Sequence, residues 1–296
     1  MPFALGERRK RFHTLEAVLD AMLRAGVDRD TCVLGVGGGV ASDLFGFAAA
    51  VYMRGVPYAH VSTSLVAMVD AAIGAKTGVD LRGGKNLAGV FRAPLAVFAH
   101  IDALQTLPYR ELRSGLAEVL KAAIIEGGAF FESLETLSPH AFWRWPWHSI
   151  IAESIHVKTM IVADDAHEAG MRQLLNLGHT FGHGIERASE FRIAHGAGVA
   201  LGLRAAGLLA LRTGRFSRAE HLRVLALIAL LGMPLRTALA APDVLRAMQS
   251  DKKKRGGKLH FVLPRAIGDV EYGVTVGDSK VLEVLRALSA SPQGLG

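Results

Sequence analysis

A short apolar run that ends in three consecutive glycines places the strongest constraint on the fold. Residues 31–36 have the length and composition of a buried strand, and Gly37, Gly38 and Gly39 separate them from a helical stretch that starts at Ala41. Glycines at such a turn leave backbone N–H groups free to approach a phosphate at the helix N-terminus. The order of strand, glycine turn and helix predicts an α/β nucleotide-binding unit. The triplet lacks the G-x-G-x-x-G spacing of the commonest dinucleotide motif, so a simple tight turn is the alternative.

The rest of the chain divides into two regions that differ in their predicted secondary structure. Residues 14–25 have helical periodicity, residues 58–62 and 95–101 have the character of short strands, and after Pro108 nearly everything from 110 to 246 is typical of helices. A chain of 296 residues is long for one hydrophobic core. We therefore expect an α/β domain over residues 1–108 and a helical domain over 109–296. Within the second domain, residues 258–263 alternate like a strand and residues 279–288 predict a closing helix.

Composition narrows the range of partners. Half of the residues are hydrophobic and 21% are charged, as in globular proteins, and the net charge is +7. Such a charge is compatible with nucleic acid, an anionic membrane or an acidic small molecule. The basic clusters at 8–11 and 252–255 have no interleaved aromatic residues of the kind that single-strand binders use. An acidic metabolite is therefore the favoured partner, with no nucleic acid and no membrane.

Cellular location and redox chemistry are constrained only weakly. The longest apolar run, residues 224–233, is too short to cross a bilayer, and the first residues lack the apolar segment of a secretory signal. A cytoplasmic location is expected. Cys32 is the only cysteine, and its position in the apolar run predicts a buried residue without thiol chemistry.

The segment Asn176-Leu177-Gly178-His179-Thr180-Phe181-Gly182-His183 predicts a metal centre. His179 and His183 are four residues apart and share one face of a helix, and that face extends backwards to Asn176 and Arg172. With Glu118 and His195 added, the chain offers a carboxylate and imidazoles, which suit zinc and leave positions open for substrate. Spacing does not decide which two of the three histidines bind. Either histidine of the segment alone is equally well explained as a core or surface residue.

Residues 69–86 carry a second set of polar side chains. Asp70, Lys76, Lys85 and Asn86 lie in a segment rich in Gly, Ala and Thr, which is able to wrap an anionic ligand. Lysine suits phosphate as a point charge. The alternative is that these are exposed loop residues.

Several blocks of sequence together resemble the 3-dehydroquinate synthase family and its sugar phosphate cyclase relatives. The blocks are residues 37–55, 69–86, 114–121 and 172–186, His195-Gly196 and residues 251–253, in order over nearly the whole chain. The resemblance implies an NAD- and divalent-metal-dependent carbon–oxygen lyase of the shikimate pathway of aromatic amino acid biosynthesis. Its substrate would be 3-deoxy-D-arabino-heptulosonate 7-phosphate and its products 3-dehydroquinate and phosphate. The implied fold is α/β followed by all-α, with an incomplete Rossmann-like NAD-binding domain, a helical domain that holds Zn²⁺ or Co²⁺, and a homodimeric assembly.

The resemblance also implies roles for individual residues. The metal ligands would be Glu118, His179 and His195, with His183 facing the substrate. Substrate hydroxyl positions match Asp70, Lys121 and Lys158, and carboxylate positions match Arg172 and Lys158. Phosphate positions match Lys76, Asn86, Asn176, His183 and Lys253, and Arg54 matches a residue that reaches the neighbouring subunit's site. Nucleotide-binding residues would be Gly37, Gly38, Gly39, Asp43, Thr63, Ser64, Lys76, Lys85, Glu7 and Lys10.

Two departures from the family pattern leave alternatives open. Family members begin with a further α/β stretch, so we expect either a start that lies upstream or a truncated, inactive remnant, and in both cases an apolar sheet edge without a partner. Ala71, Ala72 and Asp80 depart from the usual residues, and the run from Asp70 to Val79 especially resembles cyclases that act on sedoheptulose 7-phosphate. A substrate that carries a carboxylate is favoured by Arg172, Asn176, His183 and Lys158 together. An oxidoreductase like the iron-dependent alcohol dehydrogenases is a third alternative, which the basic residues argue against.

Overall fold

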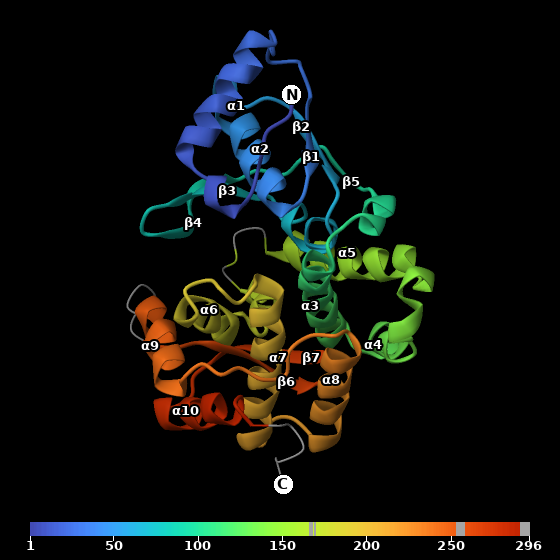
Figure 1. Cartoon of the computed structure of the whole chain (residues 1–296), viewed down its shortest axis with the longest axis vertical. Helices are drawn as coiled ribbons and strands as arrows, with labels where there is room; N and C mark the ends of the chain where they lie inside the picture. The colour runs from blue at the N-terminus through green and yellow to red at the C-terminus, as the bar shows by residue number, and fades with distance from the viewer. Residues whose placement is uncertain (166–167, 169, 253–257, 291–296) are drawn as a thin grey trace. The chain divides into compact units, whose positions relative to one another are not determined.

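The chain folds into two compact units, Met1–Gly115 and Leu116–Gly296 (Figure 1). The computed structural model describes residues 1–165, 168, 170–252 and 258–290. In this part of the chain no helix is both long and apolar enough to cross a membrane.

Unit 1 has α/β architecture. Its elements in chain order are η1 (Glu7–Arg9), α1 (Phe12–Arg24), β1 (Val33–Gly37), α2 (Gly39–Val51), η2 (Tyr52–Arg54), β2 (Tyr58–Ser62), the π-helical turn η3 (Ala67–Ala71), β3 (Lys76–Leu81), β4 (Gly84–Phe91), β5 (Ala96–Ala99) and η4 (Ile101–Gln105). Strands β1, β2 and β5 form a parallel sheet in that order, with Val33 opposite Tyr58 and Ala59 opposite Ala96. The predicted strands at 58–62 and 95–101 and the helix at 14–25 are therefore confirmed.

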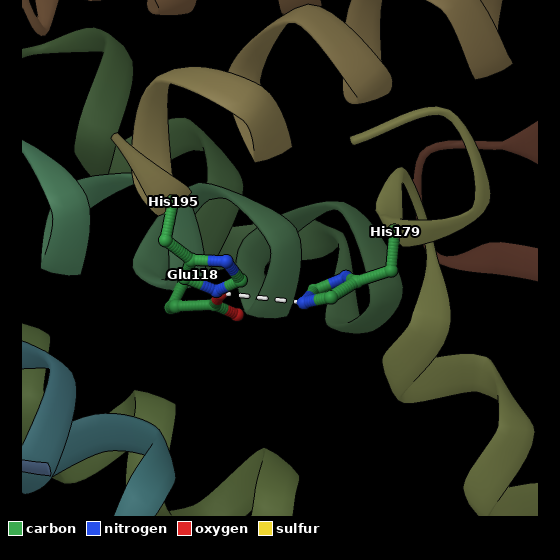
Figure 2. A group of neighbouring side chains, drawn as sticks. All are labelled: Glu118, His179 and His195. Atoms are coloured by element: carbon green, nitrogen blue, oxygen red, sulfur yellow. Dashed lines mark hydrogen bonds and ion pairs between the residues drawn. The ribbon is translucent and has the colours of Figure 1, made fainter. Parts of the chain in front are cut away.

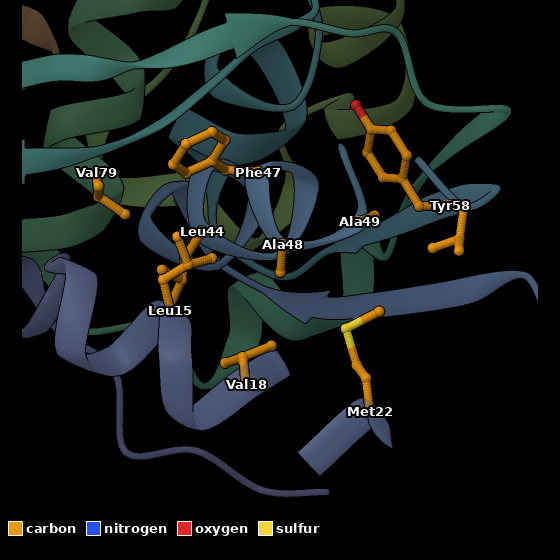
Figure 3. Close-up of a cluster of buried hydrophobic side chains, with 10 residues drawn as sticks. Leu15, Val18, Met22, Leu44, Phe47, Ala48, Ala49, Tyr58 and Val79 are labelled. Carbon is orange, nitrogen blue, oxygen red and sulfur yellow. The ribbon is translucent and has the colours of Figure 1, made fainter. Parts of the chain in front are cut away.

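The core of unit 1 lies where α1 and α2 pack on each other and on the strands (Figure 3). It is formed by Leu15, Val18 and Met22 of α1, by Leu44, Phe47, Ala48 and Ala49 of α2, and by Val56, Tyr58 and Val79. The spacing of the α1 residues is helical, which explains why the sequence predicted this helix correctly. At about 25 cal/mol per Å² of buried apolar surface, such a cluster is the main stabilising contribution to this unit.

Strand β1 is an edge strand with one uncovered face. Gly35 is buried towards α2, whereas Leu34 and Val36 are 55% and 56% exposed. Among the described residues β1 pairs with β2 alone, so its other edge is unpaired, as predicted. The prediction that Cys32 is buried was wrong, because Cys32 is exposed just before this edge strand. A continuous apolar run indicates a strand covered on both faces, but only one face of β1 is covered by the described residues.

Strands β3 and β4 form an antiparallel hairpin in the segment that we had interpreted as a ligand-wrapping loop. The backbones approach closely at Gly78 and Gly89. A Cβ atom added to Gly89 would lie 1.9 Å from the Thr77 carbonyl oxygen. The glycines that suggested a loop are thus needed for the pairing of two strands.

Unit 2 is mainly helical and begins within α3 (Tyr109–Glu126). Its further elements are α4 (Gly128–Glu135), η5 (Pro139–Arg144), α5 (Trp147–Asp164), η6 (Met171–Asn176), α6 (His179–Ala188), α7 (His195–Arg212), α8 (Arg218–Leu230), α9 (Ala241–Lys252), β6 (Phe261–Ala266), β7 (Asp269–Val274) and α10 (Asp278–Ala287). Helix α7 packs against α6, α8, α10 and β6 and is buried along most of its length (Figure 1). The expected strand near 258–263 is the first strand of the β6–β7 hairpin, which is the one departure from helical structure in the described part of this unit.

Candidate metal centre

Three side chains from three helices of unit 2 point towards one another (Figure 2). Glu118 comes from α3, His179 is the first residue of α6 and His195 is the first residue of α7. Glu118 Oε1 lies 3.5 Å from His179 Nε2 and 3.2 Å from His195 Nε2. The three ligand atoms all lie within 4.8 Å of one another. One carboxylate oxygen and two imidazole nitrogens at this spacing fit a divalent zinc-like ion.

The carboxylate of Glu118 is divided between two kinds of partner. Its Oε2 atom forms an ion pair with Lys121 Nζ at 2.5 Å, one helical turn along α3, and its Oε1 atom faces the imidazoles. Burial alone would raise the pKa of Glu118, but Lys121, followed by His179 and His195, holds the pKa of that carboxyl well below its usual range. Glu118 is therefore charged at neutral pH, with one oxygen facing the imidazoles.

The imidazoles are oriented by the hydrogen bonds of their other nitrogens. His179 Nδ1 lies 3.2 Å from the Leu177 carbonyl oxygen, and His195 Nδ1 lies 2.9 Å from Glu186 Oε1. When a cation takes the place of the Nε2 proton, an acceptor at Nδ1 keeps the remaining ring proton there and leaves the Nε2 lone pair for the cation. In both rings that Nε2 atom is the one that faces Glu118. Burial would lower the pKa of His195, but its hydrogen bonds to Glu118 and Glu186 outweigh that effect and raise the pKa to about 10.

Glycines bring α6 and α7 close enough to place these ligands. A Cβ atom on Gly202 of α7 would lie 1.9 Å from the carbonyl oxygen of Gly178, and one on Gly182 would lie 3.0 Å from that of Gly198. Gly178 itself has a left-handed φ of 78° just before α6 begins. The glycines of the sequence motif therefore serve helix packing and the entry into α6, not only chain flexibility.

The helical face that we extended from His183 back to Arg172 is interrupted. Leu177 and Gly178 separate η6, which carries Arg172 and Asn176, from α6. The prediction of one continuous stripe was wrong, because the left-handed Gly178 ends the regular spacing. The Asn176 side chain donates to Glu168 Oε1 at 2.7 Å, and the backbone N–H of Arg172 donates to Asp165 Oδ2 at 3.1 Å.

Buried cations belong to the same unit. Lys121, Lys158 of α5 and Arg172 are 3%, 9% and 2% exposed, and η6 packs against α5. Each of the three has an interaction partner, as buried side chains of this type need, and Lys121 pairs with Glu118.

His183 is exposed on α6, and with Glu186 and His195 it forms a second, overlapping group of three ligand atoms. Binding at that group would break the 2.9 Å hydrogen bond between His195 Nδ1 and Glu186. A cation at the group around Glu118 would replace the 3.2 Å contact between His195 Nε2 and Glu118 Oε1, but it would leave the Nδ1 hydrogen bond of each imidazole intact. The geometry therefore favours Glu118, His179 and His195 among the combinations that spacing left open.

The glycine turn and its neighbours lie together in unit 1. Gly37 ends β1 and Gly39 begins α2, as the sequence indicated. The Thr63 N–H donates to the Gly37 carbonyl oxygen at 2.9 Å, and a Cβ atom on Gly38 would lie 2.9 Å from Ser64 Oγ. The turn, Thr63 and Ser64 thus form one surface at the carboxyl ends of β1 and β2, where nucleotides bind in open α/β sheets.

Four of the remaining nucleotide-binding candidates form two ion pairs. Lys10 is buried and contacts both the Asp43 carboxylate and Asn86 Oδ1, and Lys85 Nζ lies 2.8 Å from Glu7 Oε1. Burial raises the pKa of Asp43 against the opposing effect of Lys10. The structure therefore brings these five residues into one polar cluster on unit 1.

The other candidates lie at separate places. Asp70 is in η3, and Lys76 is the exposed first residue of β3. Arg54 is exposed on η2 with a left-handed φ of 67°, a conformation that bulky residues rarely adopt. Lys253 lies outside the described residues.

Glu186 was missed by the sequence reasoning. It lies seven residues after His179, which is two helical turns along the same face of α6. This spacing was the available signal. We had followed that face only towards the N-terminus.

Family models match the chain over most of its length. The model described as 3-dehydroquinate synthase N-terminal matches residues 1–114, and that described as 3-dehydroquinate synthase C-terminal matches residues 115–254. A 3-dehydroquinate synthase of Solibacter usitatus is 42% identical over 289 residues, covering 96% of this chain and 81% of that protein. A 3-dehydroquinate synthase of Gloeobacter violaceus is also 42% identical, covering 96% of this chain and 80% of that protein.

Solved structures of sugar phosphate cyclases share the fold. A 2-epi-5-epi-valiolone synthase from Streptomyces hygroscopicus with NAD⁺ and Zn²⁺ bound is 33% identical, with a TM-score of 0.89 over 97% of this chain and 81% of that one. A 2-deoxy-scyllo-inosose synthase complexed with carbaglucose-6-phosphate, NAD⁺ and Co²⁺ is 26% identical, with a TM-score of 0.88. The match covers 97% of this chain and 82% of that one. A maleylacetate reductase from Agrobacterium tumefaciens shares the fold alone, at 14% identity and a TM-score of 0.62. The match covers 94% of this chain and 79% of that one. The matched models, the relatives and the site geometry together show that the chain belongs to the 3-dehydroquinate synthase family.

Proposed function

We propose that the chain is a 3-dehydroquinate synthase, an NAD- and metal-dependent lyase that converts 3-deoxy-D-arabino-heptulosonate 7-phosphate to 3-dehydroquinate and phosphate. The observation that carries the proposal is the convergence of Glu118 Oε1, His179 Nε2 and His195 Nε2 in a chain that is 42% identical to proteins of that name. The reaction places it in the shikimate pathway, and we propose a cytoplasmic homodimer.

In this proposal unit 1 binds the nucleotide and unit 2 holds the metal. Gly37, Gly38 and Gly39 at the start of α2, with Thr63 and Ser64 beside them, would face the pyrophosphate. Glu118, His179 and His195 would hold Zn²⁺ or Co²⁺. When bound, NAD⁺ would accept and return a hydride and the ion would polarise a substrate oxygen.

The side chains around the metal site would bind and orient the substrate. Lys121 fixes the Glu118 carboxylate through Oε2, and Lys158 and Arg172 would bind the substrate carboxylate. His183 and Asn176 would contact the phosphate, as would Lys76, Asn86 and Lys253. Because the chemistry needs an eliminated phosphate, these residues contribute by holding the leaving group in one orientation.

An assay of phosphate release tests the function. The purified chain is incubated with the heptulosonate phosphate and NAD⁺, with and without a chelator. We expect phosphate and 3-dehydroquinate in equal amounts, loss of at least 90% of the rate on chelation and recovery with Zn²⁺ or Co²⁺. Steady accumulation of NADH would instead indicate an oxidoreductase, and metal binding without NAD binding or turnover would indicate a non-catalytic remnant.

A cyclase acting on sedoheptulose 7-phosphate is the second candidate. It is favoured by the run from Asp70 to Val79, in which Ala71 and Ala72 replace small hydroxyl residues of the family pattern. Running the same assay with both sugar phosphates distinguishes the two. We expect kcat/KM to be higher for the carboxylated substrate.

A further inference from the structure

We propose that Glu186 is a positioning residue of the metal centre, which holds His195 in the orientation and tautomer that a divalent cation needs. The inference rests on the proposed metal centre and concerns a residue with no role in the substrate or cofactor assignments above. Its basis is a hydrogen bond of 2.9 Å between Glu186 Oε1 and His195 Nδ1.

The two carboxylates lie at opposite nitrogens of the same ring. Glu186 faces Nδ1 of His195 at 2.9 Å, and Glu118 faces Nε2 at 3.2 Å. A carboxylate can only accept, so without a cation the ring donates to Glu186 from Nδ1 and to Glu118 from Nε2. When a cation displaces the Nε2 proton, the Nδ1 proton stays with Glu186, and the Nε2 lone pair lies at the point where Glu118 and His179 meet. An imidazole with a carboxylate at its other nitrogen is also the more basic ligand.

Packing holds Glu186 in place. Its side chain is 6% exposed, and it lies on α6 against Gly198 of α7. A Cβ atom on Gly198 would come within 3.1 Å of Glu186 Cγ and 3.3 Å of Oε1. The glycine therefore leaves the space that the carboxylate needs to reach a ring one helical turn earlier on α7.

The two candidate histidine ligands differ in the hydrogen-bond partner of their Nδ1 atom. His179 Nδ1 has a neutral partner, the carbonyl oxygen of Leu177 in the preceding residues, at 3.2 Å. His195 has no such local carbonyl among its described hydrogen bonds and takes its partner from another helix. His195 is also the more exposed ring, at 39% against 13% for His179. The ligand with more freedom to rotate is the one that a charged partner restrains.

The affinity of the full chain for Co²⁺ tests the proposal. It is measured by competition with a chromophoric chelator. We expect Glu186→Ala to weaken Co²⁺ binding about 10- to 100-fold, the range found for outer-shell partners of metal ligands. Glu186→Gln, which keeps the size of the side chain, should weaken it less and should retain the melting temperature of the parent. The exposed Glu190→Gln, in the same stretch of chain, is the matched control and should leave affinity within twofold.

Nitrogen-15 chemical shifts of the His195 ring in the metal-free protein give a readout that activity does not. The parent should show a protonated Nδ1 hydrogen-bonded to a carboxylate, and Glu186→Ala should lose that signature. Affinity of Glu186→Ala within twofold of the parent would overturn the proposal. Loss of binding in Glu186→Ala with retention in Glu118→Ala would overturn it too, because Glu186 would then be a direct ligand. Failure of the parent to bind one Co²⁺ per chain would instead refute the metal centre itself.

Discussion

Lys121 Nζ and Glu118 Oε2 form an ion pair of 2.5 Å whose two side chains are 4% and 1% exposed, one turn apart on α3. Breaking a buried pair by removing one partner leaves an uncompensated charge and costs about 3–5 kcal/mol. We expect Lys121→Met to destabilise the metal-free chain by roughly that amount, as measured by urea unfolding.

A bound cation would compensate the charge of Glu118 in this variant. The loss of stability caused by Lys121→Met should therefore be smaller in saturating Zn²⁺ than in chelator. Equal losses in the two conditions would contradict the placement of the ion next to Glu118.

Close packing of α6 and α7 is the second testable feature. A Cβ atom at Gly202 would lie 1.9 Å from the Gly178 carbonyl oxygen. Gly178 directly precedes His179, and Gly202 lies on the helix that begins at His195. We expect Gly202→Ala to cost more than about 2 kcal/mol and to weaken metal binding. Gly277→Ala is the control, because the nearest atom that its Cβ would meet is 4.0 Å away. A Gly202→Ala variant as stable as the parent would show that the helices have room to separate.

Acid should destabilise the chain through His221 of α8. Its side chain is buried, and neither ring nitrogen has a hydrogen-bond partner among the described residues. Burial, with a contribution from Arg204, lowers the pKa of His221 to about 4. The unfolded chain therefore binds more protons between pH 6.5 and 4, so stability is fully present above about pH 6.5 and is lost as the pH falls towards 4, by up to about 3 kcal/mol.

Urea unfolding at pH 7.5 and pH 5 measures this effect. His221→Leu should flatten the dependence of stability on pH over that interval, whereas the exposed His148→Leu on α5 should leave it unchanged. His60 of β2, also buried and with its pKa lowered by burial to about 4, should contribute a similar loss in unit 1. If the slope of stability against pH is the same in His221→Leu as in the parent, the His221 ring is not held neutral in the folded chain.

Arg172 tests the substrate assignment. If its guanidinium binds a carboxylate, Arg172→Met should raise KM about 10- to 100-fold for the heptulosonate phosphate, the size expected for a charge-assisted hydrogen bond. For a neutral sugar phosphate the change should be much smaller. The exposed Arg187→Met of α6 controls for the loss of one positive charge. Equal increases in KM for both substrates would argue against a role in carboxylate recognition.

The sequence predicted best what depends on local spacing. The strand at Tyr58–Ser62 and the helix around Leu15 and Val18 follow from periodicity and apolar content, and the glycine turn follows from its position between strand and helix. The β3–β4 hairpin was missed, because its glycines lower strand propensity while the paired backbones require them. The exposure of Cys32 was missed because the number of covered sheet faces is a tertiary property.

For the site, residue spacing identified the candidates but not which histidines share Glu118, and only the family resemblance singled out Glu118, His179 and His195. Spacing on α6 gave His179 and His183 as equals, and only the crossing of α7 shows that His195 shares Glu118 with His179. Glu186 depends on the same crossing, since its partner is nine residues away on another helix. Contacts between helices set these roles, and no local pattern encodes them.

Anomalous diffraction at the zinc edge, from crystals of the chain soaked in Zn²⁺, measures the position of the ion directly. We predict one strong peak within about 2.0–2.2 Å of Glu118 Oε1, His179 Nε2 and His195 Nε2. A peak bound by His183 and Glu186 without Glu118, or no peak near these helices at full soak, would contradict the assignment of the metal centre.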